Sequence, residues 1–164
     1  MVLIGVMSDS HDNMDAIRRA VEFFNSKEVE LVIHAGDIIS PFTIRAFKEL
    51  SCPIKAVTGN NDGDLLSLKK FFEGKGEISS FFLSLEMDGV KVAVNHGHYP
   101  DILEALIVSG KYDVVICGHT HERVNRKVGN TLVVNPGETC GYLTGKKSVA
   151  IVNLRRLQAE IIEI

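Results

Sequence analysis

The feature that most constrains this chain is a pattern that occurs five times, in which a run of apolar, often β-branched residues ends in a small cluster of residues able to bind metal. A continuous apolar run is typical of a strand buried on both faces, as in α/β folds. Open α/β sheets bind ligands at the carboxyl ends of their strands. The pattern therefore predicts one site at one edge of the fold. The five clusters are Asp9-Ser10-His11, Gly36-Asp37, Gly59-Asn60-Asn61-Asp62, His96-Gly97-His98 and His119-Thr120-His121.

Strands and helices alternate in the first third of the chain. A helix capped by Asp12 or Asn13 separates the first two strands, and a second helix, capped by Ser40 with Pro41 at its first position, precedes the third. This alternation predicts right-handed βαβ crossovers and a parallel sheet. The three strands are expected at residues 2–7, 31–35 and 54–58.

The pattern changes after Asp62. Asp88-Gly89 is a two-residue hairpin signal, and Pro100 begins a helix that ends near Gly110. A buried strand is expected at 113–117, and the chain after it is expected to form antiparallel strands. We predict an α/β fold, a four-layer αββα sandwich of two mixed β-sheets flanked by helices, as a single domain over residues 1–164. The remaining expected elements are a helix at 65–72 and strands at 81–87, 90–95, 124–128, 131–134, 148–154 and 159–162.

Composition excludes several classes of protein. The net charge of −3 without a basic block argues against general nucleic-acid binding. No apolar stretch approaches the ~20 residues of a membrane span. Cys52, Cys117 and Cys140 are odd in number and widely spaced, which argues against a disulfide framework and favours the cytoplasm. We expect these cysteines to be buried apolar residues, with a ligand or reactive role as the alternative.

The residue types in the clusters indicate transition-metal binding. Residues i and i+2 at a strand end point to the same side, so Asp9 and His11 can bind one ion. His119 and His121 have the same spacing and could share one site or serve two. Asp37 could bridge two ions through its two oxygens. Mixed carboxylate, imidazole and carbonyl ligands suit Mn, Fe, Ni or Zn.

Each cluster alone has a simpler explanation, such as a helix cap, a surface histidine or a turn, but five together do not. His34 lies within a strand, and we expect it to hydrogen bond in the core or behind a ligand. Asn135-Pro136-Gly137 follows a strand, and could form either a wall of the site or a plain turn.

Taken together, the five clusters resemble the five sequence blocks of the calcineurin-like metallophosphoesterases, in the same order and with similar spacing. The short chain, Asn61 and the Asn135-Pro136-Gly137 segment resemble the small archaeal and bacterial phosphodiesterase branch. That branch is also similar to the small, metal-site-bearing subunit of the eukaryotic retromer coat. The resemblance implies two metal ions bridged by Asp37 and by a water or hydroxide. It implies that Asp9, His11 and His121 hold the first ion, and that Asn60, His96 and His119 hold the second.

The resemblance also implies an activity, hydrolysis of small phosphate diesters by the bridging hydroxide. Mn is the favoured metal, with Ni, Fe, Zn or Mg as alternatives. The alternative functions are a phosphomonoesterase, a dinucleotide-polyphosphate hydrolase, or a non-catalytic scaffold of the retromer type. Assembly into a homo-oligomer is left open.

One position departs from the family pattern. Many members have histidine where this chain has Asn61. An amide can donate a hydrogen bond to a phosphoryl oxygen but cannot act as an ordinary general acid. His98, beside His96, is the candidate to replace that histidine in catalysis, and a solvent-facing or supporting position is its alternative.

Overall fold

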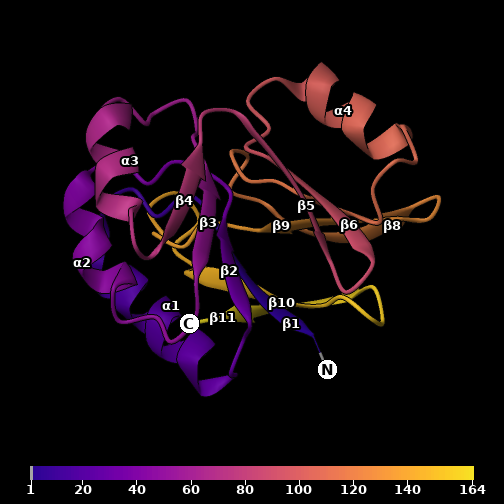
Figure 1. Ribbon diagram of the computed structural model, residues 1–164. Helices are drawn as coiled ribbons and strands as arrows, with labels where there is room; N and C mark the ends of the chain where they lie inside the picture. The colour runs from indigo at the N-terminus through magenta and orange to yellow at the C-terminus, as the bar shows by residue number, and fades with distance from the viewer. Residues whose placement is uncertain (1) are drawn as a thin grey trace.

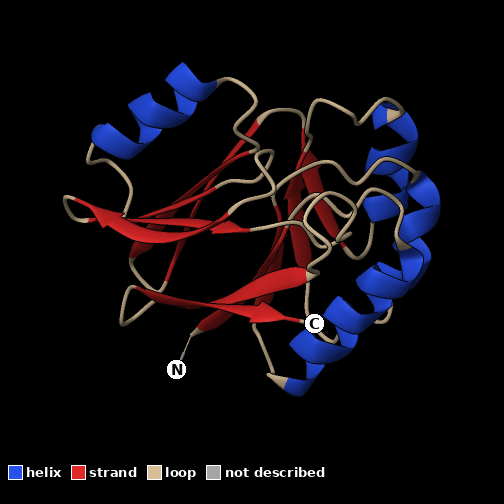
Figure 2. Cartoon of the chain, turned by 180° about the vertical axis from the view of Figure 1, so that it is seen from behind, coloured by secondary structure: helices blue, strands red, loops and turns tan. Residues whose placement is uncertain are grey.

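The computed structural model describes residues 2–164. Two β-sheets pack face to face, three helices cover one outer face, and the fourth covers the other (Figures 1 and 2). The four-layer αββα sandwich is therefore confirmed. The helices are α1 (Met14–Ser26), α2 (Ile44–Phe47), α3 (Leu65–Phe72) and α4 (Pro100–Val108), with a 3₁₀ turn η1 (Pro41–Thr43) before α2. The strands are β1 (Leu3–Met7), β2 (Leu31–His34), β3 (Ile54–Val57), β4 (Gly76–Ser79), β5 (Phe82–Met87), β6 (Val90–Asn95), β7 (Val114–Ile116), β8 (Arg123–Val128), β9 (Thr131–Pro136), β10 (Ser148–Asn153) and β11 (Gln158–Glu163).

The two sheets are both mixed. The first has the strand order β11-β10-β1-β2-β3-β4, in which β1 to β4 are parallel and β10 and β11 are antiparallel additions. The second has the order β5-β6-β7-β9-β8, with β6, β7 and β9 parallel at its centre and antiparallel strands at both edges. Parallel strands end at the same edge, so β1, β2, β3, β6 and β7 deliver all five clusters to one edge of the sandwich.

The main core lies between the sheets. Ile4, Ile33 and Ile116 are fully buried there, because every second residue of these central strands faces the other sheet. Phe24 of α1 packs on the outer face of the first sheet, and Ile107 of α4 packs on the second. These apolar layers hold the strand ends in place.

Several local expectations need correction. Strand β4 was not expected, because Gly76 and Glu77 made a short edge segment look like a loop. The second helix is shorter than expected, a single turn of α-helix from Ile44 to Phe47 after η1. The C-terminal third is not wholly antiparallel, because β9 pairs in parallel with β7.

Other expectations are confirmed. Asn13 is the N-cap of α1, where its side chain accepts a hydrogen bond from the backbone N–H of Ala16. Cys52, Cys117 and Cys140 are buried and form no disulfide within residues 2–164. None of the helices in that range has the length and apolar character needed to cross a membrane.

Candidate metal centre

Backbone hydrogen bonds join the loops that carry the clusters. The N–H of Asp9 donates to the carbonyl of Gly36 at 2.9 Å, and the N–H of His11 donates to the carbonyl of Asp37 at 3.1 Å. In the second sheet, the N–H of Gly118 donates to the carbonyl of His96 at 3.0 Å. The clusters are therefore held together by the main chain as well as by the sheets.

The ligand-type side chains converge through left-handed backbone turns. Asp9, His11 and Asp37 have φ angles of 52°, 40° and 59°, and His119 and His121 have 67° and 60°. The expectation that strand alternation would aim Asp9 and His11 together was therefore wrong in its reason, although the two side chains do converge. Asp and His tolerate this region better than most residues, yet each such residue carries some strain. Clustered strain of this kind is typical of a functional site.

Two glycines allow the loops to approach the ligand side chains. At Gly36, where φ is 105°, an added Cβ would lie 2.5 Å from Nδ1 of His96. At Gly118, an added Cβ would collide with Oγ of Ser8, which hydrogen bonds to Asp9, and would lie 2.7 Å from Oδ2 of Asp9 itself. Side chains at either position would displace a ligand-type residue.

One half of the centre consists of Asp9, His11 and His121. Their ligand atoms all lie within 4.8 Å of one another. Asp9 Oδ1 is 3.4 Å from Nε2 of His121 and 3.9 Å from Nε2 of His11. Asp9 Oδ1 and His11 Nε2 are both buried and have no hydrogen-bond partner within the described chain.

The other half consists of Asn60, His96 and His119. Oδ1 of Asn60 lies 3.1 Å from Nε2 of His96 and 3.0 Å from Nδ1 of His119, so three candidate ligand atoms face one another. Nδ1 of His96 lies 2.7 Å from the carbonyl oxygen of Ala35, to which it can donate. In the metal-free protein Nε2 of His96 can also carry a proton toward Asp37; with a metal bound, the bond at Nδ1 would keep the remaining proton there and leave Nε2 as the ligand.

Asp37 lies between the two halves. Its Oδ2 is 3.5 Å from Nε2 of His11 and 3.4 Å from Nε2 of His96. Burial alone would raise the pKa of Asp37, but hydrogen bonds from His96 and Asn61 outweigh it and hold the pKa below its usual range. Asp37 is therefore ionised where a bridging carboxylate is needed.

The residues present fit divalent cations. Burial raises the pKa of Asp9, so a buried carboxylate here gains from a nearby positive charge. Asp9 Oδ1 and His11 Nε2, which are buried and find no hydrogen-bond partner in the described part of the chain, are the atoms that a metal would satisfy. The structure thus brings together all seven ligand candidates from the sequence: Asp9, His11, Asp37, Asn60, His96, His119 and His121.

The two catalytic candidates lie beside this centre. The amide nitrogen of Asn61 donates to Oδ2 of Asp37 at 2.8 Å, and the backbone N–H of Asn61 donates to Oδ1 of Asp37 at 2.9 Å. His98 is partly buried, with its ring 5.5 Å from that of His96 and 6.2 Å from that of His119. Its Nδ1 is buried without a partner in residues 2–164. Burial and the neighbouring His96 and His119 lower the pKa of His98.

His34 and Asn135 support the loops rather than the reacting atoms. His34 is fully buried, and its Nδ1 accepts a hydrogen bond from the backbone N–H of Gly36 while its Nε2 faces Ser10 Oγ at 2.9 Å. Asn135 donates to the carbonyl of Gly118 at 2.9 Å. Of the two readings of Asn135-Pro136-Gly137, the structure therefore favours a wall that holds the His119–His121 loop.

Two acidic residues, Asp62 and Glu138, support the centre in ways that the sequence did not predict. Asp62 accepts hydrogen bonds from the backbone N–H groups of Asp37, Ile38, Ile39 and Gly59, so it fixes the loop that carries Asp37. The only sequence feature that could have indicated this role is the position of Asp62 at the end of the Gly-Asn-Asn-Asp cluster.

Glu138 lies behind His121. It is 0% exposed, and its Oε2 accepts a hydrogen bond from Nδ1 of His121 at 2.6 Å. The same carboxylate accepts hydrogen bonds from Leu143, Thr144 and Cys140. These bonds hold the pKa of Glu138 down at about 2, against the opposing effect of burial. No sequence spacing indicated this contact, because Glu138 follows a turn and looks like a loop residue.

Comparison with known proteins places this geometry in a family. Residues 2–156 match the calcineurin-like phosphoesterase superfamily domain. The phosphodiesterase MJ0936 of Methanocaldococcus jannaschii is 48% identical over 155 residues, which cover 93% of each chain. A solved archaeal phosphodiesterase is similar with a TM-score of 0.95 and 45% identity, over 99% of this chain and 100% of that one. Vps29 from Chaetomium thermophilum is similar in fold alone, with a TM-score of 0.74 at 15% identity over 100% of this chain and 96% of that one.

Proposed function

The chain belongs to the calcineurin-like phosphoesterase superfamily, and we propose that it is a metal-dependent phosphodiesterase with a binuclear centre. The observation that carries the proposal is the convergence of seven ligand-type side chains around buried atoms that have no hydrogen-bond partner among residues 2–164. One tetrahedral or octahedral ion would not use seven such residues alongside solvent. The archaeal relatives named as phosphodiesterases support a diester as the substrate.

The two halves of the centre divide the ligands between two ions. Asp9, His11 and His121 would hold the first ion, Asn60, His96 and His119 would hold the second, and Asp37 would bridge them. When bound, two divalent ions would supply an activated water and would stabilise charge on the entering and leaving oxygens of a phosphoryl group. Mn is the metal we favour, with Ni, Fe, Zn or Mg as alternatives; mixed carboxylate, imidazole and carbonyl ligands suit several such divalent ions.

Asn61 and His98 are the groups beside the centre that can contact the phosphoryl group. The Asn61 amide can donate a hydrogen bond to a phosphoryl oxygen if it turns from Asp37, but it supplies no proton to a leaving group. The lowered pKa of His98 favours its neutral imidazole near pH 7, which can donate a hydrogen bond but carries no imidazolium proton to give to a leaving group. Such a site favours esters whose leaving groups need no proton.

The alternatives differ in what they require. A scaffold of the retromer type needs no complete ligand set, and the likeness to Vps29 concerns the fold alone. A phosphomonoesterase or a dinucleotide-polyphosphate hydrolase would use the same centre with a different substrate. The complete set of seven ligand-type residues supports an enzyme.

A substrate panel tests the proposal. Purified protein would be stripped of metal, reloaded singly with Mn, Ni, Fe, Zn or Mg, and assayed on matched aryl phosphate diesters and monoesters, with the stripped protein as the control. We expect metal-dependent turnover that is fastest on the diester. Faster turnover of the monoester would contradict the diesterase assignment, and no turnover with any metal would favour the scaffold.

A further inference from the structure

Three aromatic rings pack together beside the second half of the metal centre. Phe81, His98 and Tyr99, here called the aromatic shelf, contact one another in every combination. The centroids of His98 and Tyr99 are 4.4 Å apart, those of Phe81 and Tyr99 are 5.9 Å apart, and those of Phe81 and His98 are 6.1 Å apart. Tyr99 is 54% exposed, so one member of the cluster faces solvent.

The aromatic shelf begins where the metal ligands end. The ring of His98 is 5.5 Å from His96 and 6.2 Å from His119, both candidate ligands of the second ion. A phosphoryl group held at that ion would therefore place one of its ester substituents over or next to the shelf.

The main chain fixes the position of the shelf. The side-chain amide of Asn95 donates to the carbonyl of Phe81 at 3.1 Å, which joins the start of β5 to the end of β6. The carbonyl of Tyr99 accepts hydrogen bonds from Ile102 and Leu103 in the first turn of α4. Tyr99 has no side-chain hydrogen bond that caps α4, so helix capping does not explain its side chain.

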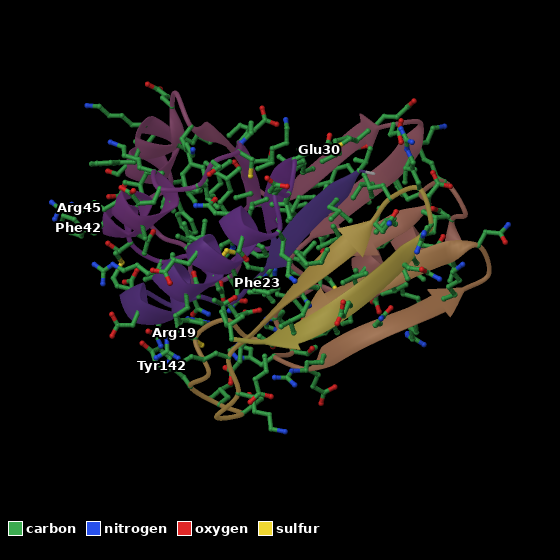
Figure 3. The ribbon with its side chains drawn as sticks, turned by 90° about the horizontal axis from the view of Figure 1, so that it is seen from below. Arg19, Phe23, Glu30, Phe42, Arg45 and Tyr142 are labelled. Carbon is green, nitrogen blue, oxygen red and sulfur yellow. The ribbon has the colours of Figure 1, made fainter. Side chains whose placement is uncertain are left out.

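Another exposed tyrosine provides a comparison. Tyr142 is 62% exposed and lies at the outer margin of the molecule (Figure 3). It contacts no histidine ring within the described residues, in contrast to Tyr99, which packs on His98. His98 also has a buried Nδ1 without a hydrogen-bond partner in residues 2–164.

We propose that the aromatic shelf is a substrate subsite that stacks a planar aromatic substituent of the phosphate ester, either an aryl ring or a nucleobase. The proposal rests on the proposed function, because the phosphoryl group must be held at the metal centre. Stacking on Tyr99 suits any flat ring, since the attraction requires a π face rather than a particular pattern of hydrogen bonds. The aromatic shelf would therefore select for a flat substituent without distinguishing substituents by their hydrogen-bonding groups.

Binding of paired inhibitors to the metal-loaded protein tests the subsite. Phenylphosphonate and methylphosphonate differ only in the ring, as thymidine 5′-phosphate and 2-deoxyribose 5-phosphate differ in the base. We expect the ligand with the ring to bind about tenfold more tightly in at least one pair. Tyr99→Ala should remove that preference without changing methylphosphonate affinity, Tyr99→Phe should keep it, and Tyr142→Ala is the matched control.

The outcomes separate the two proposals. A preference confined to the phenyl pair would identify an aryl substituent, and one confined to the thymidine pair would identify a nucleobase. Diester hydrolysis with methylphosphonate binding, but with no ring preference or with one that survives Tyr99→Ala, would overturn the subsite alone. Absence of both diester hydrolysis and phosphonate binding would overturn the proposed function, and the subsite with it.

Discussion

Replacing Glu138 by glutamine preserves the shape of the side chain but replaces one hydrogen-bond acceptor with a donor. Both carboxylate oxygens accept hydrogen bonds, Oε2 from Nδ1 of His121 at 2.6 Å and Oε1 from Oγ1 of Thr144 at 2.7 Å. The glutamine must turn its NH₂ group toward one of them. If that group faces His121, the imidazole carries its proton on Nε2, the atom 3.4 Å from Asp9 Oδ1 that would bind the first ion.

Two effects of Glu138→Gln can be estimated, one on metal affinity and one on the pH dependence of stability. Loss of a hydrogen bond that orients a ligating histidine costs about 10–100-fold in metal affinity, or ~1.4–2.8 kcal/mol. In metal-free protein, the pKa of Glu138 is lowered from 4.5 to about 2, which corresponds to roughly 3 kcal/mol of stability. Because the folded pKa lies below the unfolded value, this stability is present above pH 4.5 and is lost as the pH falls toward 2. Glu138→Gln should remove this pH dependence.

Two measurements test the prediction for Glu138. Competition with a chelator measures the affinity for the first ion, and denaturant unfolding of the metal-free protein at several pH values measures stability. Glu160→Gln, at an exposed position of β11, is the matched control and should change neither. If Glu138→Gln binds its first ion as tightly as the wild type, Glu138 does not orient His121 and the reasoning is refuted.

Three further predictions concern Asp37, Asn61 and His34. Asp37→Ala should lower diesterase turnover roughly a thousandfold or more, since the metal contribution amounts to several kcal/mol; near-normal kcat would exclude a bridging role. Asn61→His should flatten the dependence of rate on leaving-group pKa, because the wild type lacks a strong general acid; equal slopes in a leaving-group series would show that the acid comes from elsewhere, with His98→Ala as the next variant. Burial lowers the pKa of His34 from 6.5 to about 3. As the pH falls between these values, the unfolded chain binds a proton at His34 and the folded protein does not, so the metal-free protein should lose about 5 kcal/mol of stability. His34→Asn should flatten this pH dependence in denaturant unfolding, and an unchanged pH dependence would show that His34 is not the buried neutral group responsible for it.

Most of the fold follows from local pattern. The buried runs that became β1, β2 and β3 alternate with amphipathic helices, and that alternation permits few arrangements. Strand β4 could not be foreseen, because Gly76–Ser79 is short and polar and forms a strand only by pairing with β3. The parallel pairing of β9 with β7 likewise depends on tertiary packing.

The ligand residues of the site could be predicted from the sequence because each follows a buried strand and has a side chain suited to binding metal. The residues that support the ligands could not be predicted in this way. Glu138 contacts His121 across 17 residues of chain, and nothing at position 138 marks it as buried. The left-handed turns at Asp9 and His121 arise from the loops packing on one another, which no residue spacing encodes.

The number of metal ions per chain tests the central claim most directly. Protein stripped of metal would be titrated with Mn²⁺, and bound metal would be measured against protein concentration for the wild type and for His119→Ala. The geometry predicts two ions per chain in the wild type and a weakened second ion in the variant, because His119 belongs to only one half of the centre. Saturation at one ion per chain, with His119→Ala binding as the wild type does, would contradict a binuclear centre.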